Sequence, residues 1–363
     1  MEQSVMEPDA KKSRNVKSLE ERLANGENIL CAEGYVLALT RMGYVASGVW
    51  VPEFLVDRPE ILRNLHVQFA DAGSDVIEAY QYFIDRKNLT MVGKEDRVEE
   101  YNRVALRIAR EVAQERGLLF AGGVGNTNIF SDKTIADPET EIRLIHEQQV
   151  RWAKEEGVDY VIAETMSNYE EARIALEVIK SFDLPAVITL SPMGCNKDGI
   201  ATTVDDVPIA TACQRLLELG ATLVGSNCYR GPSTMINIIE DIVKVVPPEK
   251  VCALPLGYRT TKEQPTWYDL KDPLFPENFP FTDGLNPFLV TEKEIVIFTK
   301  RCMELGVKYM GICCGNMGSL TRAMATTMGK EPFLSAYHDM EKLSKVMKHK
   351  NELRSKRLKE YSN

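Results

Sequence analysis

Three cysteines stand where their thiolates could hold a metal ion. Cys313 and Cys314 are adjacent in the segment GICCG, and Cys228 ends the segment GSNC. Zinc binds thiolates in a tetrahedron with bonds of about 2.3 Å, so three protein ligands leave a fourth position open, which is typical of catalytic zinc. A chance cluster of cysteines without a metal is the alternative. The other five cysteines, which we expect to be packing residues in a reducing compartment, are Cys31, Cys195, Cys213, Cys252 and Cys302.

Eight short apolar runs could form the strands that position these cysteines. They span residues 28–34, 76–82, 118–124, 160–165, 186–192, 223–228, 252–257 and 309–315. Nearly continuous hydrophobicity is typical of parallel strands that are covered on both faces. Amphipathic patterns between them predict helices, most clearly over 59–74, 98–117, 138–158 and 168–185. Eight strand–helix repeats predict an α/β fold of the closed (β/α)8 TIM barrel type rather than an open, doubly wound sheet.

In such barrels the chemistry is found at the carboxyl ends of the strands. The expected strand ends carry Glu33–Gly34, Glu78, Gly122–Gly123, Glu164, Ser191, Asn227–Cys228, Pro255 and Cys313–Cys314. The sixth and eighth strands are two apart around the barrel, so side chains from their ends can reach one centre. Gly315 supplies the backbone freedom that could turn both neighbouring sulfurs toward that centre. We therefore predict one zinc ion per chain at Cys228, Cys313 and Cys314.

Composition limits the class of protein and its partners. Among 363 residues, 44 Lys and Arg stand against 53 Asp and Glu, a net charge of −9 that gives no general attraction to nucleic acid. No apolar run approaches the roughly 18 residues of a membrane span, and the first residues lack the apolar core of a secretion signal. We expect a cytoplasmic protein that acts on small molecules, without nucleic-acid or membrane partners.

The chain is expected to divide into three parts. Residues 1–18 are predicted to be a flexible segment, residues 19–330 the barrel, and residues 331–363 a helical tail with an apolar stripe. Its basic charge run is interpreted as a solvated helix face. The proline-rich stretch 257–291 is too long for an ordinary connection, so we expect a lid or an assembly surface.

The segments GSNC and GICCG resemble the zinc signature of the homocysteine S-methyltransferase family, and the resemblance runs from Leu19 to about Lys330. It is closest to the betaine–homocysteine branch, through ERLANGENIL, TRMGYVASGVWVPE, AGSDVIEAYQY, VDYVIAET and LPLGY. The resemblance implies that homocysteine binds zinc through its sulfur and accepts a methyl group from a cationic donor, either betaine or a sulfonium such as S-methylmethionine, to give methionine. It also implies a homodimer or homotetramer joined through the tail, and no catalytic residue beyond the zinc site.

The same resemblance places Glu33, Gly34 and Glu164 against the amino-acid part of homocysteine, where a carboxylate can pair with the ammonium group. Glu33 stands where the betaine branch has Asp, so either the pocket has a different shape that fits the longer side chain or the acceptor is a different thiol. A strand-end charge without a substrate role is the alternative for both glutamates.

For the donor, the resemblance indicates an aromatic cage, because aromatic rings attract a cation that cannot form hydrogen bonds. Trp50 matches the cage tryptophan of the betaine branch, and Tyr82 and Phe83 lie where that branch uses a tyrosine. Thr165 replaces a further tyrosine of the branch, so the donor stays open. Trp50 is equally well interpreted as a core residue.

Two other functions remain as alternatives. A zinc-free barrel lyase or isomerase would need a phosphate site after the seventh and eighth strands, where LGYRTT offers one arginine. A non-catalytic zinc or redox-sensing barrel would use Cys313 and Cys314 as a switch, with saturated coordination and no amino-acid pocket.

Overall fold

The computed structural model describes residues 16–45, 52–275, 284–335 and 340–361. Eight parallel strands close into a barrel in the order β1-β10-β9-β8-β5-β4-β3-β2. They are β1 (Ile29–Ala32), β2 (Val76–Glu78), β3 (Leu119–Gly125), β4 (Tyr160–Met166), β5 (Ala186–Leu190), β8 (Leu223–Asn227), β9 (Val251–Leu254) and β10 (Tyr309–Ile312). Each overlaps one predicted apolar run, so the (β/α)8 prediction is confirmed. Trp50, the expected cage residue, lies outside the described residues.

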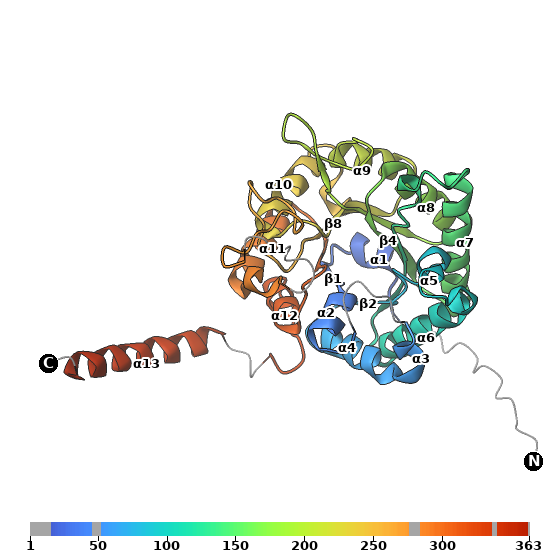
Figure 1. Cartoon of the computed structure of the whole chain (residues 1–363). Coiled ribbons are helices and arrows are strands. Elements are labelled where there is room, and N and C mark those ends of the chain that lie inside the picture. The colour runs from blue at the N-terminus through green and yellow to red at the C-terminus, as the bar shows by residue number, and fades with distance from the viewer. Residues whose placement is uncertain (1–15, 46–51, 276–283, 336–339, 362–363) are drawn as a thin grey trace, which may run out of the picture.

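A ring of helices surrounds the barrel (Figure 1). The main ones are α4 (Pro59–Asp71), α6 (Val98–Arg116), α7 (Pro138–Glu156), α8 (Tyr169–Ser181), α9 (Ile209–Glu218), α10 (Pro232–Ile242), α11 (Glu292–Glu304) and α12 (Gly318–Thr327). α6 and α7 end at Gly117 and Gly157, both in the left-handed conformation that glycine adopts without strain. The shorter helices are α2 (Tyr35–Arg41), α3 (Phe54–Asp57) and α5 (Arg86–Thr90).

The amino-terminal end of the barrel is closed by α1 (Leu19–Ala24). Leu19 is buried in one cluster with residues that begin strands, such as Ile29 and Tyr309. A Ser18–Glu21 capping box fixes the start of this helix. Packing fills this end of the described barrel, and the cavity for a ligand lies at the carboxyl ends of the strands.

Between β5 and α9 the chain forms a small antiparallel hairpin, β6 (Gly194–Cys195) and β7 (Ala201–Thr202). Cys195 is exposed on it, so the expectation that it is a packing residue was wrong, whereas the other four such cysteines are buried. Strands of two residues in a polar stretch leave no periodic pattern, and sequence analysis therefore missed this hairpin.

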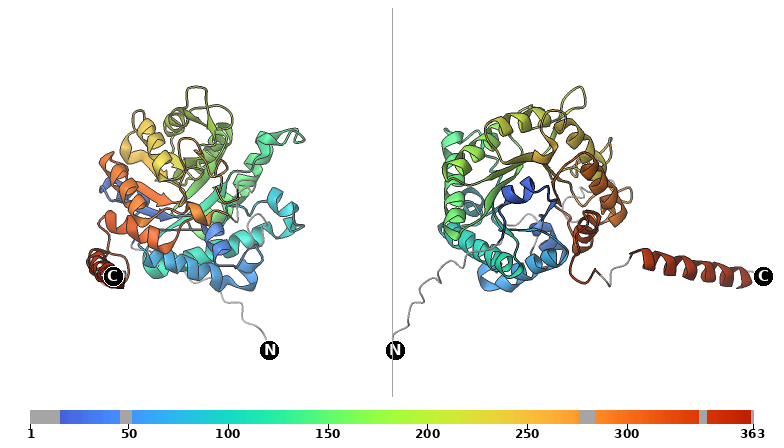
Figure 2. Two further views of the ribbon diagram at one scale, coloured as in Figure 1. Left: turned by 60° about the vertical axis from the view of Figure 1, so that its left-hand side comes forward. Right: turned by 180° about the vertical axis from the view of Figure 1, so that it is seen from behind.

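The chain ends in α13 (Met340–Tyr361), within the region for which a helical tail is expected. It extends away from the barrel in Figure 1 and in the right-hand view of Figure 2. Val346, Met347 and Leu353 are about half exposed on it. Its role in assembly stays a prediction. No described helix combines the length and apolarity that a membrane crossing would need.

Candidate metal centre and substrate pocket

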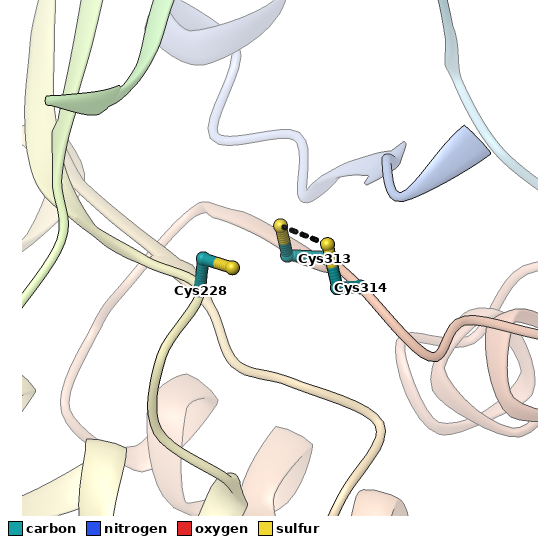
Figure 3. A group of neighbouring side chains, drawn as sticks. All are labelled: Cys228, Cys313 and Cys314. Atoms are coloured by element: carbon teal, nitrogen blue, oxygen red, sulfur yellow. Dashed lines mark hydrogen bonds between the residues drawn. The ribbon is translucent and has the colours of Figure 1, made fainter. Parts of the chain in front are cut away.

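The three cysteines of the predicted metal site lie together at the carboxyl end of the barrel. Cys228 follows β8 directly, and Cys313 and Cys314 follow β10. Their sulfur atoms all lie within 4.8 Å of one another. The sulfurs of Cys313 and Cys314 are 4.0 Å apart, and the sulfur of Cys228 points toward this pair (Figure 3). This spacing leaves room for one ion that contacts all three.

Local backbone turns make this convergence possible. Cys228 and Tyr229 both have positive φ, 60° and 59°, a conformation that costs a non-glycine residue energy and is often found at functional sites. The amide of Cys228 donates to the carbonyl oxygen of Leu254 at 3.0 Å, which ties this turn to β9. After Cys314, Gly315 has a φ of 84°, in agreement with the backbone freedom expected there.

Gly34, the turn residue after β1, is fitted against the cysteine pair. Its φ is 81°, and a Cβ atom at this position would overlap the backbone of Cys313. Only glycine therefore allows the β1–α2 turn to lie so close to the thiols.

The donor set suits a thiophilic metal ion. Cys228 and Cys313 are almost fully buried, and none of the three forms a disulfide. Burial raises the pKa of Cys228 well above its usual range, and contact with the Cys228 sulfur raises the pKa of Cys314. A bound cation would reverse these effects, because coordination stabilises the thiolate form. Zinc as the ion stays a prediction.

Two of the site carboxylates are joined by one amide. Asn227 Nδ2 donates to Glu33 Oε2 at 3.2 Å and to Glu164 Oε2 at 3.4 Å. It also donates to Thr165 Oγ1 at 2.9 Å, while Asn227 Oδ1 accepts from the Thr165 amide at 2.9 Å. Sequence analysis placed Asn227 at a strand end but predicted no role for it, because this network joins residues far apart in the chain.

A third carboxylate, Glu78, belongs to the same site. Glu33 is 1% exposed and Glu78 is 2% exposed, whereas Glu164 is open to the cavity. Burial raises the pKa of all three carboxyls well above the usual range. The negative charge of a neighbour raises each pKa further: Glu78 acts on Glu33, Glu164 acts on Glu78, and Glu33 acts on Glu164. The empty site therefore favours protonated carboxyls, because water cannot compensate for several negative charges held close together there.

Beside the thiols lies a cavity of about 310 Å³, which is large enough for small organic ligands. Gly34, Glu164, Tyr82 and Phe83, which were expected to contact substrates, all line it, and the last two rings meet edge to face at 4.2 Å. Glu33 is not among the lining residues, but Asn227 joins it to Glu164, which is.

An aromatic group that sequence analysis did not assign forms another wall of the cavity. Tyr229, Trp267 and Tyr268 line it, with ring centroids 5.6 to 5.9 Å apart. The amide of Trp267 donates to the carbonyl oxygen of Tyr229 at 3.0 Å. Part of the 257–291 stretch thus lies over the site. The aromatic residues of that stretch were the feature of the sequence that could have indicated this wall.

A parallel barrel with three converging thiols and buried carboxylates at its open end has the form of a metal-assisted barrel enzyme. The sequence profile of the homocysteine S-methyltransferase family matches residues 34–328, and the chain therefore belongs to this family of methyltransferases.

Relatives of this chain carry two different donors in their names. A betaine–homocysteine S-methyltransferase 1 from Xenopus tropicalis is 34% identical over 326 residues, covering 87% of this chain and 76% of the relative. An S-methylmethionine–homocysteine S-methyltransferase from Pongo abelii is 31% identical over 318 residues, covering 86% and 81%. The metallated homocysteine methyltransferase MmuM from Escherichia coli superposes with a TM-score of 0.64 at 16% identity, covering 84% of this chain and 98% of the other. At that identity the structural likeness shows the fold alone.

Proposed function

We propose that this chain transfers a methyl group from a cationic donor to the thiol of homocysteine, giving methionine, with one zinc ion held by Cys228, Cys313 and Cys314. The observation that carries the proposal is the group of three thiols within 4.8 Å at the barrel's open end. Membership of the family and the names of the relatives support homocysteine as the acceptor and either betaine or a sulfonium such as S-methylmethionine as the donor.

When bound to three thiolates, zinc lowers the pKa of a thiol that it takes as a fourth ligand, which supplies a nucleophile near neutral pH. The protein's own residues orient the acceptor. Glu33 and Glu164 offer carboxylate oxygens to the substrate ammonium, and Asn227 holds those two carboxylates in place. Gly34 keeps the backbone beside the thiols free of a side chain.

The aromatic walls orient the donor. Tyr82 and Phe83 on one side, with Tyr229, Trp267 and Tyr268 on another, present ring faces and edges to the cavity. Rings attract the methyl groups of an onium cation and exclude water from them. Holding the donor methyl in line with the acceptor sulfur lowers the entropic part of the barrier.

The test combines zinc content with methyl transfer to homocysteine from betaine, S-methylmethionine, S-adenosylmethionine and dimethylsulfoniopropionate. We expect one zinc per chain and methionine from at least one donor. Cys313→Ala should lose both, whereas Cys302→Ala, a matched change of a buried cysteine in α11, should keep both. Full activity in the Cys313→Ala variant would refute the proposal. Bound zinc without product from any donor would instead favour another acceptor thiol or a non-catalytic role.

We further propose that the protein acts in the cytoplasm as a homodimer or homotetramer, with α13 packed on a neighbouring subunit. The exposed apolar side chains of Val346, Met347 and Leu353 support this, because an isolated helix in water gains nothing from such residues. Deleting residues 340–363 should lower the number of subunits per particle, which light scattering gives from the mass of the assembly. An unchanged number of subunits would contradict the proposed role of the tail.

A further inference from the structure

Glu78 Oε2 is a buried carboxylate oxygen at the cavity for which the described residues offer no hydrogen-bond donor; Glu33 Oε1, outside the cavity lining, is another. It ends β2, is 2% exposed and lines the cavity. The Asn227 amide donates to Glu33 and to Glu164, and these bonds leave Glu78 Oε2 without a donor. The neighbouring carboxyl of Glu164 brings no positive charge to Glu78. A buried carboxylate oxygen without a donor or a cation is costly, and such groups are found where a ligand completes them.

No described residue that lines the cavity carries a positive charge that could compensate for Glu78. The described residues that line it include Glu78 and Glu164 but no lysine, arginine or histidine. Burial and the neighbouring Glu164 raise the pKa of Glu78 well above its usual range, so the empty site favours the protonated carboxyl, whereas a bound cation favours the ionised form. The missing partner of this carboxylate is therefore a cation that the ligand brings.

We propose that Glu78 selects the methyl donor by charge. It pairs with the onium centre of donors that carry no carboxylate beside that centre, and it rejects zwitterions whose carboxylate lies one carbon away. This inference rests on the proposed methyl transfer, and it adds the class of donor that the pocket accepts.

The groups of the acceptor already have places elsewhere in the site, so we assign Glu78 to the donor. The acceptor sulfur belongs at the thiols, and its ammonium belongs at Glu33 and Glu164, which Asn227 connects to the Cys313 sulfur at 3.8 Å. Glu78 instead shares the cavity with Tyr82 and Phe83, whose rings suit an organic cation. A cavity of about 310 Å³ also admits a whole donor molecule rather than an ion alone.

The size of the selection follows from Coulomb's law. Two like charges about 6 Å apart, at an effective dielectric constant of about 20, repel one another enough to lower affinity about a hundredfold. A carboxylate one carbon from the onium centre would lie at about that distance from Glu78 once the onium is bound. A carboxylate three carbons away can turn toward solvent and avoid most of this repulsion.

The activity test compares two sulfonium donors with the zinc-loaded full chain. S-methylmethionine has its carboxylate three carbons from sulfur, and dimethylsulfonioacetate has it one carbon away. We expect kcat/KM to favour S-methylmethionine at least tenfold, and Glu78→Gln to shrink that ratio at least tenfold while the KM for homocysteine stays constant. Glu171→Gln, which neutralises a buried carboxyl outside the cavity, should leave the ratio unchanged. A ratio that Glu78→Gln does not alter would overturn the inference.

Binding separates failure of the inference from failure of the proposed function. Choline and betaine share a trimethylammonium group, and only betaine carries the adjacent carboxylate. Calorimetry on the same protein should show choline binding at least tenfold more tightly, and Glu78→Gln should remove that preference, whether or not any donor is turned over. Equal affinities in the unmodified protein would overturn the inference. So would a second bound metal ion, lost in Glu78→Gln, because the ligand atoms of Cys31, Glu33 and Glu78 also lie within 4.8 Å of one another.

Discussion

Replacing Asn227 by Asp should test whether one amide holds the carboxylates of the site together. The side chain keeps its shape, but its Nδ2 donor becomes an oxygen that faces Glu33 at 3.2 Å and Glu164 at 3.4 Å. Asn227 is fully buried, so water cannot replace the lost donor. The change therefore converts two attractive contacts into repulsive ones.

The expected cost follows from those two contacts. With both carboxyls ionised, a hydrogen bond to each charged group contributes about 1.5–3 kcal/mol, so losing two removes about 3–6 kcal/mol. Breaking a buried charged network typically costs about 3–5 kcal/mol. We therefore expect Asn227→Asp to lower the free energy of unfolding by about 4 kcal/mol, a large part of the 5–15 kcal/mol of an ordinary domain.

Urea denaturation followed by circular dichroism measures this directly, with a chelator in every sample so that bound metal does not contribute. Ser226→Ala is the matched control on the same strand, because it removes one neutral hydrogen bond, from Ser226 Oγ to the Leu190 carbonyl oxygen at 2.9 Å. That control should cost about 1 kcal/mol. If Asn227→Asp costs no more than Ser226→Ala, the amide does not hold these carboxylates, and the argument for an ordered acceptor site fails.

Three further predictions test other parts of the site. Gly34→Ala should lose homocysteine and zinc binding, because its Cβ would overlap the Cys313 backbone. The control Gly26→Ala is also at positive φ but in open space, so it should cost only the left-handed strain of about 1–2 kcal/mol. Calorimetry for homocysteine and metal analysis for zinc compare the two variants. Burial raises the pKa of Glu171 to about 7, so the folded state keeps a proton that the unfolded state has lost, and stability should fall by up to about 3 kcal/mol as pH rises from about 4.5 to 7. In urea titrations at pH 5 and pH 8, Glu171→Gln should lack this fall, and an equal fall in both proteins would contradict the assignment. In steady-state assays, Trp267→Ala should raise the KM for the methyl donor at least tenfold and leave the KM for homocysteine unchanged. Equal changes in both KM values would show that Trp267 does not act on the donor alone.

The barrel could be predicted from the sequence because parallel strands covered on both faces are continuous apolar runs. The run at 309–315 extends past the end of β10 at Ile312, and the run at 223–228 passes Asn227 by one residue. The excess residues are the three cysteines of the site and Gly315. The cysteines are apolar by type but have already left strand geometry in order to turn toward one another, and hydrophobicity alone cannot show that change.

The carboxylate network and the second aromatic wall could not be predicted in the same way. Asn227 acts through one partner directly after β1 and one on β4, and the amide of Trp267, which lines the cavity, bonds to Tyr229. Both depend on which strands are neighbours and on how a long loop folds back. Single residue types in a sequence carry neither kind of information, whereas the adjacent cysteines carried their own signal.

Backbone strain in this protein is concentrated where the ligands are expected. Seven described non-glycine residues have φ between 52° and 61°, and four of them, Asn128, Thr165, Cys228 and Tyr229, line the cavity. Each such position costs about 1–2 kcal/mol, and surrounding contacts must hold it. The Asn227 bond to the Thr165 amide and the Leu254 bond to the Cys228 amide are contacts of this kind. Packing in the interior of the closed barrel offsets this cost. The strain at the open end is the structural consequence of turning thiols, rings and carboxylates toward one centre.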